Sequence, residues 1–168
     1  MADLPVYRGT FGEREAERLL WRAGFGPKPG EARKLARRFK LKGAVRSLTR
    51  PRAAEGLAGP EPLDGDGLPI APFDAWGHDL LWWLDRMVRT TRPFEERMAL
   101  IWHDWFATAD VSSERLAIQQ VEMFRRHAGG SFLDLVLEVT VDPAMLIWLS
   151  GLENTKRSPN ENLSLIHI

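Results

Sequence analysis

Two adjacent segments of the chain carry apolar residues at the spacing of an α-helix. In FDAWGHDLLWWLDRMVRTT the helical pattern i, i+4, i+7, i+8, i+11 is formed by Trp76, Leu80, Trp83, Leu84 and Met87. In PFEERMALIWHDWFAT the same spacing is formed by Phe94, Met98, Ile101, Trp102 and Trp105. The period predicts two amphipathic helices, and the short TTRP turn between them favours an antiparallel pair. We expect the tryptophans of these stripes to belong to the core.

Helix start and stop signals recur through the rest of the chain, whereas strand alternation does not. They predict helices at about residues 11–23 and 29–39, and in the segments KGAVRSL, SSERLAIQQVEMFRRHAGG, SFLDLVLEVT and DPAMLIWLSG. Because Phe132–Val139 is apolar nearly all round, we expect that helix to lie in the middle of the bundle. The expected fold class is all-α, an irregular helical bundle that is incomplete at its C-terminal end.

One stretch interrupts this helical pattern. Residues 50–72 carry proline and glycine too densely for a regular element. We interpret the stretch as a surface excursion inside a single domain, and the alternative is a flexible linker between two modules. Residues 1–162 are then expected to form the N-terminal part of one larger helical domain.

Composition excludes several classes of function. The 23 Lys and Arg residues balance the 23 Asp and Glu residues, so no global field attracts nucleic acid. The basic run from Arg33 to Arg52 is interpreted as a solvated helix face. Cysteine is absent, which excludes disulfides, thiol nucleophiles and cysteine-bound zinc. The most apolar segment is interrupted by Asp134, Glu138 and Asp142, so no membrane span is expected.

Two groups of polar residues could carry chemistry. His103, in WHDWFAT beside Asp104, could be a proton shuttle or a metal ligand, or a hydrogen-bonded histidine at the margin of a core. The loop GLENTKRSPNEN contains Asn154, Asn160, Glu161 and Asn162, an inventory suited to binding a polar ligand or to orienting a histidine, and also typical of a solvated loop. Arg22, in the last turn of the first helix, could reach a carboxylate elsewhere. The sequence leaves any cofactor or metal undefined.

The order and wording of three segments resemble a known family. The segments RLLWRAGFGPKPGE, FEERMALIWHDWFAT and FRRHAGGSFLDLVLEVTVDPAMLIWLSGLENTKRSPNEN are similar to the bacterial family catalogued as domain of unknown function 1800. The resemblance covers about residues 18–162 and includes the positions of Arg22, His103 and the Asn-Glu-Asn cluster. It implies one assembled polar pocket but no particular reaction. Members of the family often accompany a second family that is similar to secreted sulfatases and phosphatases.

The last six residues depart from the family pattern. Where the resemblance implies a helix of the form A-R-E-L after the Asn-Glu-Asn cluster, this chain has LSLIHI. These letters match the translation of a transposase sequencing adapter, so we expect residues 163–168 to be a non-native tail. At the other end, MADLPVYRGTFGERE shows no export signal. The default location is therefore cytoplasmic, unless the start codon lies further upstream.

Two functions are consistent with these observations. One is an envelope-associated enzyme of the hydrolase type, with His103 and Glu161 as catalytic residues and Arg22, Asp104, Asn154, Asn160 and Asn162 as binding residues. The other is a non-catalytic helical partner or chaperone of the companion sulfatase-like or phosphatase-like protein, in which the polar cluster stabilises the fold.

Overall fold

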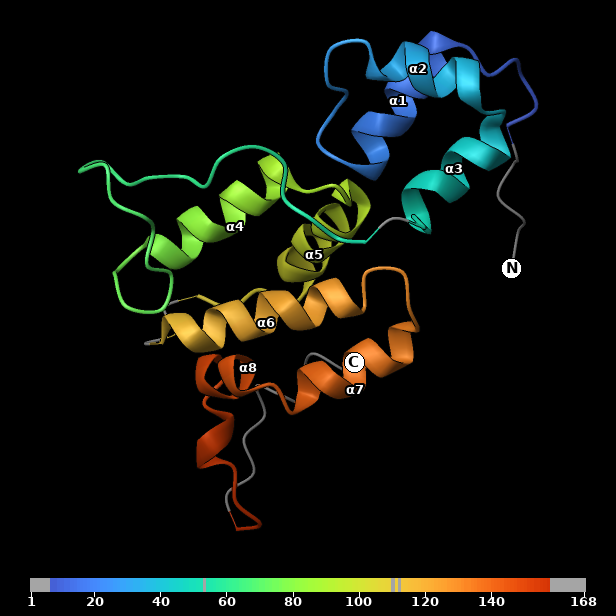
Figure 1. Ribbon diagram of the computed structural model, residues 1–168. Coiled ribbons are helices and arrows are strands. Elements are labelled where there is room, and N and C mark those ends of the chain that lie inside the picture. Colours follow the sequence, from blue (N-terminus) through green and yellow to red (C-terminus); the bar gives the residue numbers. More distant parts are fainter. Residues whose placement is uncertain (1–6, 53, 110, 112, 158–168) are drawn as a thin grey trace. The chain divides into compact units, whose positions relative to one another are not determined.

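The protein is all-α, as its sequence predicts (Figure 1). The computed structural model describes residues 7–52, 54–109, 111 and 113–157. Within these ranges it contains eight α-helices and one 3-10 turn, and the only β-type pairings are two isolated bridges. None of the helices in the described part is both long enough and apolar enough to cross a bilayer. The chain divides into two compact units, Met1–Ala54 and Glu55–Ile168.

The first unit is a small three-helix assembly. It consists of α1 (Glu13–Ala23), α2 (Glu31–Arg38) and α3 (Leu41–Thr49). Ala16, Leu20 and Ala32 form its core, because small side chains allow α1 and α2 to approach closely. After α1 the chain turns at Gly26, whose φ of 102° lies in a region that favours glycine. The arginines of α2 are exposed, as expected for a solvated face.

The second unit contains the remaining helices. These are α4 (His78–Arg89), α5 (Pro93–Trp105), α6 (Glu114–Arg126), α7 (Phe132–Thr140), α8 (Pro143–Trp148) and the 3-10 turn η1 (Gly151–Glu153). Helix α6 lies between α4 and α5 on one side and α7 and α8 on the other (Figure 1). The core that these helices share is formed by Ala99, Phe106, Met123, Phe124, Leu135, Val139 and Met145.

The proline-rich and glycine-rich stretch has no helix or strand among its described residues, as predicted, but it is anchored to α4. The Ala58 N–H donates to the Arg89 carbonyl over 2.8 Å, and the Thr91 N–H donates to the Gly56 carbonyl over 2.9 Å. At the other end of the stretch, the Ala71 N–H donates to Nδ1 of His78. These bonds join both ends of the described stretch to α4 or its immediate neighbours, and the surface excursion and the flexible linker both stay predictions. The boundary between the compact units falls inside the stretch, and its assignment to one larger domain stays a prediction.

The two predicted stripes do not form the core that their spacing suggested. Helices α4 and α5 do pack as an antiparallel pair, since Arg86 contacts Glu96 and Trp83 contacts His103. However, Trp76 precedes α4 and is 93% exposed, and Trp105 is 66% exposed. Of the first stripe only Trp83 is buried. The helices meet on faces that carry charged and polar side chains, which a purely apolar pattern does not detect.

The expectation for α7 was also wrong. Leu135 and Val139, one turn apart, are buried in the core of the second unit. In contrast, Leu133 and Leu137, on another side of the helix, are exposed. Helix α7 therefore lies at the margin of the described bundle, because its neighbours cover only one of its faces.

Candidate functional site

The buried face of α5 is polar at two of its four positions. Glu96, Ala99, His103 and Phe106 follow one another at intervals of three, four and three residues, which places them on the same side of the helix. Glu96 and Ala99 are completely buried, and His103 is half-buried. This face meets α4 and α6. His103 is therefore part of the contact between the three helices and is only half-buried within it.

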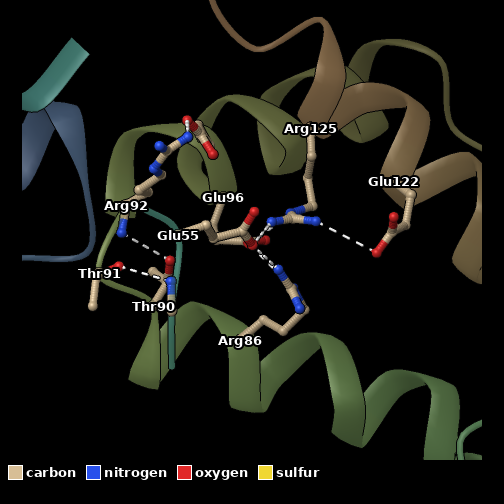
Figure 2. A network of polar contacts seen from close by, with 10 residues as sticks. Glu55, Arg86, Thr90, Thr91, Arg92, Glu96, Glu122 and Arg125 are labelled. Carbon is tan, nitrogen blue, oxygen red and sulfur yellow. Dashed lines mark hydrogen bonds and ion pairs between the residues drawn. The ribbon is translucent and has the colours of Figure 1, made fainter. Parts of the chain in front are cut away.

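Around Glu96 the three helices are joined by ion pairs (Figure 2). The Glu96 carboxylate accepts from Nε of Arg125 over 2.7 Å and from Nε of Arg86 over 3.3 Å. One arginine comes from α6 and the other from α4, so the carboxylate of α5 lies between two cations. Its second oxygen, Oε2, is buried and has no partner among the described residues.

Glu55 closes this network from the proline-rich and glycine-rich stretch. Its carboxylate pairs with both Arg86 and Arg125, and Figure 2 shows the two guanidinium groups converging on it. Arg125 also reaches Glu122 over 3.4 Å. Burial lowers the pKa of Arg125, but the carboxylates of Glu96 and Glu55 outweigh burial and raise that pKa overall. Arg125 therefore stays charged. We call this set, Glu55, Arg86, Glu96, Glu122 and Arg125, the ionic layer.

His103 lies in a second, aromatic layer of the same three helices. Its ring contacts Trp83 of α4 at 5.1 Å between ring centroids and Phe124 of α6 at 6.3 Å. Burial lowers the pKa of His103 below its ordinary value of 6.5, and the charge of Asp104 offsets part of this effect. No hydrogen bond to the ring comes from any described residue. At neutral pH the imidazole is therefore uncharged and can accept a proton.

A pocket of about 790 Å³ opens beside His103. Its wall is largely aromatic and aliphatic, with Trp76, Trp82 and Trp83 among its residues. The polar side chains in the wall, besides His103, are Asp79, Thr108, Glu114 and Gln120. A cavity of this size with a few polar groups is typical of a small-molecule site.

Gln120 connects this pocket to the start of α8. Its side-chain carbonyl accepts from the Thr108 hydroxyl over 2.6 Å, and its amide donates to Asp142 over 2.7 Å. Asp142 in turn caps α8 by accepting from the Met145 N–H over 2.9 Å. Both Gln120 and Asp142 are buried, so their hydrogen bonds hold the pocket wall in one arrangement.

The predicted site residues fall into three groups. His103 and Asp104 are neighbours on α5, with His103 in the pocket wall and Asp104 exposed. Arg22 is exposed in the last turn of α1, and Asn154 is exposed directly after η1 and is not among the described residues of the pocket wall. Asn160, Glu161 and Asn162 lie outside the described residues. No metal-binding group of three or more His, Cys, Asp or Glu side chains occurs in the described part.

Sequence reasoning did not identify the ionic layer. Its members lie far apart in the sequence: Glu96 follows Arg86 by ten positions, and Arg125 follows Glu96 by 29 positions. One signal was present, because Glu96, Ala99 and His103 share a helical face that combines small and polar residues. A face of that kind suggests a buried polar contact. Nothing local indicated that Arg86 and Arg125 were its partners.

Comparison with protein families matches residues 18–164 to a family described as "Protein of unknown function (DUF1800)". The chain belongs to this family. The DUF1800 match spans the described helices from α2 to α8 and most of α1, so the ionic layer and the His103 pocket lie within it. Searches of curated proteins and of solved structures found no match for the chain.

Proposed function

We propose that the pocket beside His103 is an active site of the hydrolase type, in which His103 is the general base. The observation that carries the proposal is the half-buried, uncharged imidazole in the wall of a roomy pocket. A base whose pKa lies near or below the working pH is available in its proton-accepting form. In this position His103 would remove a proton from a water molecule, which would then attack a bound ester or a related group.

The neighbouring residues support this chemistry in different ways. Thr108 and Gln120, which hydrogen-bond to each other, supply fixed polar groups in the same wall. The ionic layer holds α4, α5 and α6 together, so Trp83 and His103 keep their relative position. Glu161 as a second catalytic group, and Arg22, Asp104, Asn154, Asn160 and Asn162 as binding residues, stay predictions, as does an association with the cell envelope.

The proposal is tested by comparing two histidine variants of the full chain. His103→Gln removes the base, and His127→Gln is the matched control, because His127 pairs with Glu138 and does not line the pocket. Hydrolysis is measured on p-nitrophenyl carboxylic, phosphoric and sulfuric esters. We expect His103→Gln to lose about 10²- to 10⁴-fold in rate, while His127→Gln keeps the rate of the unmodified chain. Equal rates for all three proteins on every hydrolysed ester would contradict the proposal.

A second candidate is the role of a non-catalytic helical partner. It is favoured by large apolar side chains that are exposed in the second unit: Trp76, Trp105, Leu133, Leu137 and Trp148. Exposed apolar groups of this size are common at protein interfaces. The companion sulfatase-like or phosphatase-like protein is the expected partner. Isothermal titration with the purified companion tests this function, and loss of binding in Trp105→Ser with the fold retained would support it.

A further inference from the structure

The His103 pocket has a one-sided charge. Asp79 from the first turn of α4 and Glu114 from the first turn of α6 both line it. Neither carboxylate takes part in an ion pair or a side-chain hydrogen bond with another described residue. No lysine or arginine occurs among the described residues of the wall. With His103 uncharged, the wall is negative and would repel an anionic ligand.

The aromatic residues of the same wall suit a cation. Trp76 is almost fully exposed, so the face of its indole ring is open to a ligand. Two aromatic rings of the second unit already hold cations, and one of them, Trp82, belongs to this wall. The Arg86 guanidinium lies 5.1 Å from the ring centroid of Trp82, and that of Arg115 lies 4.9 Å from the ring centroid of Phe73. Indole faces bind ammonium groups through the same electrostatic attraction.

The ring of Trp83 contacts the base, but its N–H is not open to the pocket. The indole Nε1–H of Trp83 is buried and has no partner among the described residues. Trp83 is only 8% exposed, lines the pocket and contacts the His103 ring. Because this N–H has almost no accessible surface, Trp83 contributes its apolar ring and no donor to the pocket.

A neighbouring pocket has a wall of mixed charge. This second pocket, of about 720 Å³, shares Trp82 and Ile118 with the first, and its wall includes three arginines and three carboxylates: Arg86, Arg115, Arg126, Glu122, Glu138 and Asp142. Arg86 and Arg126 are paired with carboxylates, whereas Arg115 is stacked on Phe73. The carboxylates of the second wall are thus balanced by arginines, whereas Asp79 and Glu114 have no cationic side chain beside them in the described wall of the His103 pocket.

We propose that the His103 pocket takes a ligand that carries an ammonium group, such as a cationic ester. The ammonium group lies between Asp79, Glu114 and the face of Trp76. This assignment rests on the proposed function, because it names the substrate class of the same site. Anionic esters, including phosphate and sulfate esters, are excluded by the negative wall.

The ligand class is tested by direct binding to the full chain, without any turnover. Choline is titrated against 3,3-dimethylbutan-1-ol, its uncharged isostere, and against acetate, with tryptophan fluorescence and calorimetry as readouts. We expect choline to bind at least about tenfold more tightly than the isostere, with an affinity that falls as salt is added. The double variant Asp79→Asn, Glu114→Gln should lose this preference. Asp134→Asn, which changes an exposed acid in the first turn of α7 outside the pocket, is the matched control and should keep it.

The outcomes separate the ligand class from the proposed reaction. Choline binding that depends on Asp79 and Glu114 supports the ligand class, whatever His103→Gln does to hydrolysis. Equal affinities for choline and its isostere, a preference for acetate, or no binding of any probe would overturn it. If choline fails to bind while hydrolysis of neutral p-nitrophenyl esters depends on His103, the proposed reaction is supported and the ligand class is refuted. If choline binds and His103→Gln leaves hydrolysis unchanged, the ligand class is supported and the proposed reaction is refuted.

Discussion

Replacing Glu96 tests the physical role of the ionic layer. The substitution Glu96→Gln keeps the size of the side chain and removes only its charge. The remaining oxygen can still accept from the Nε atoms of Arg86 and Arg125, which lie 3.3 and 2.7 Å from Oε1. The new amide group would occupy the place of Oε2, which has no partner in the described part of the chain. The stability change therefore reports the charge of Glu96.

The expected magnitude follows from these two bonds. A hydrogen bond that involves a charged carboxylate contributes about 1 kcal/mol more than its neutral equivalent, so two such bonds predict a loss of about 2 kcal/mol. Glu96→Ala removes the whole carboxylate. The two half-buried arginines then keep Glu55, which is partly exposed, as their shared partner. For that variant we expect about 3 to 5 kcal/mol, the range for breaking a buried ion pair.

Urea denaturation of the full chain measures both losses, with circular dichroism as the readout. Glu122→Gln is the matched control, because its carboxylate makes one contact of 3.4 Å and its side chain is 45% exposed. We expect this control to lose less than about 1 kcal/mol. The reasoning fails if Glu96→Gln and Glu122→Gln reduce the free energy of unfolding by the same amount.

Three further predictions concern His103, Asp142 and Gly26. Burial lowers the pKa of His103 in the folded state, so the unfolded chain binds more protons at low pH. The free energy of unfolding should therefore fall as the pH drops below 6.5. In denaturation curves, His103→Gln should remove this part of the pH dependence. Asp142→Ala removes the cap of α8 and leaves the buried amide of Gln120 without an acceptor, and denaturation should show a loss of about 2 to 3 kcal/mol. Gly26→Ala places a Cβ 2.9 Å from the Trp21 ring at a φ of 102°, and thermal unfolding should show a loss of about 1 to 3 kcal/mol.

Each of these predictions has a control in the chain. His78→Gln changes another histidine, which accepts from the Ala71 N–H at the start of α4, and should keep the part of the pH dependence that is assigned to His103. Ser131→Ala removes an exposed cap whose contact with the Asp134 N–H is 3.3 Å, so its loss should stay near 0.5 kcal/mol. Gly65→Ala adds a Cβ that meets nothing within 4 Å and should be nearly neutral. A control that loses as much stability as its test variant would refute the corresponding explanation.

Helix positions could be predicted from the sequence because their signals are local. Pro93 and Pro143 each occupy the first position of a helix, and Ser113 and Asp142 each cap one, as their neighbours in the sequence suggest. The lack of regular structure in the excursion also followed from its composition. Both features depend on the backbone of a few adjacent residues, so they need no knowledge of the tertiary fold.

The faces of the helices were harder to predict. The apolar stripes in α4 and α5 indicated a core contact, but α5 turns Glu96 and His103 inward and leaves Trp105 exposed. A buried carboxylate is stable only next to its partners, and Arg86 and Arg125 come from other helices. In α5, polar residues were buried against expectation, and in α7 apolar residues are exposed against expectation. The apolar sequence of α7 predicted a buried helix, but Leu133 and Leu137 are exposed.

The candidate site was predicted in part. His103 stood out as a titratable residue within an aromatic helix, and the structure places it in a pocket wall. Its neighbours Asp79, Glu114 and Gln120 were not predicted, because they come from segments that approach only in the folded chain. Glu161, Asn160 and Asn162 were predicted from composition and resemblance, and their relation to His103 stays a prediction.

The central claim is that His103 is an uncharged, proton-accepting group in a pocket at neutral pH. Its most direct test is an NMR titration of the histidine ring signals in the full chain, with His103→Gln used to assign the His103 resonance. We predict a pKa for His103 below its ordinary value of 6.5, because burial disfavours the imidazolium. A pKa at or above that value would show that the imidazolium is stabilised, and would contradict the role of His103 as a neutral base.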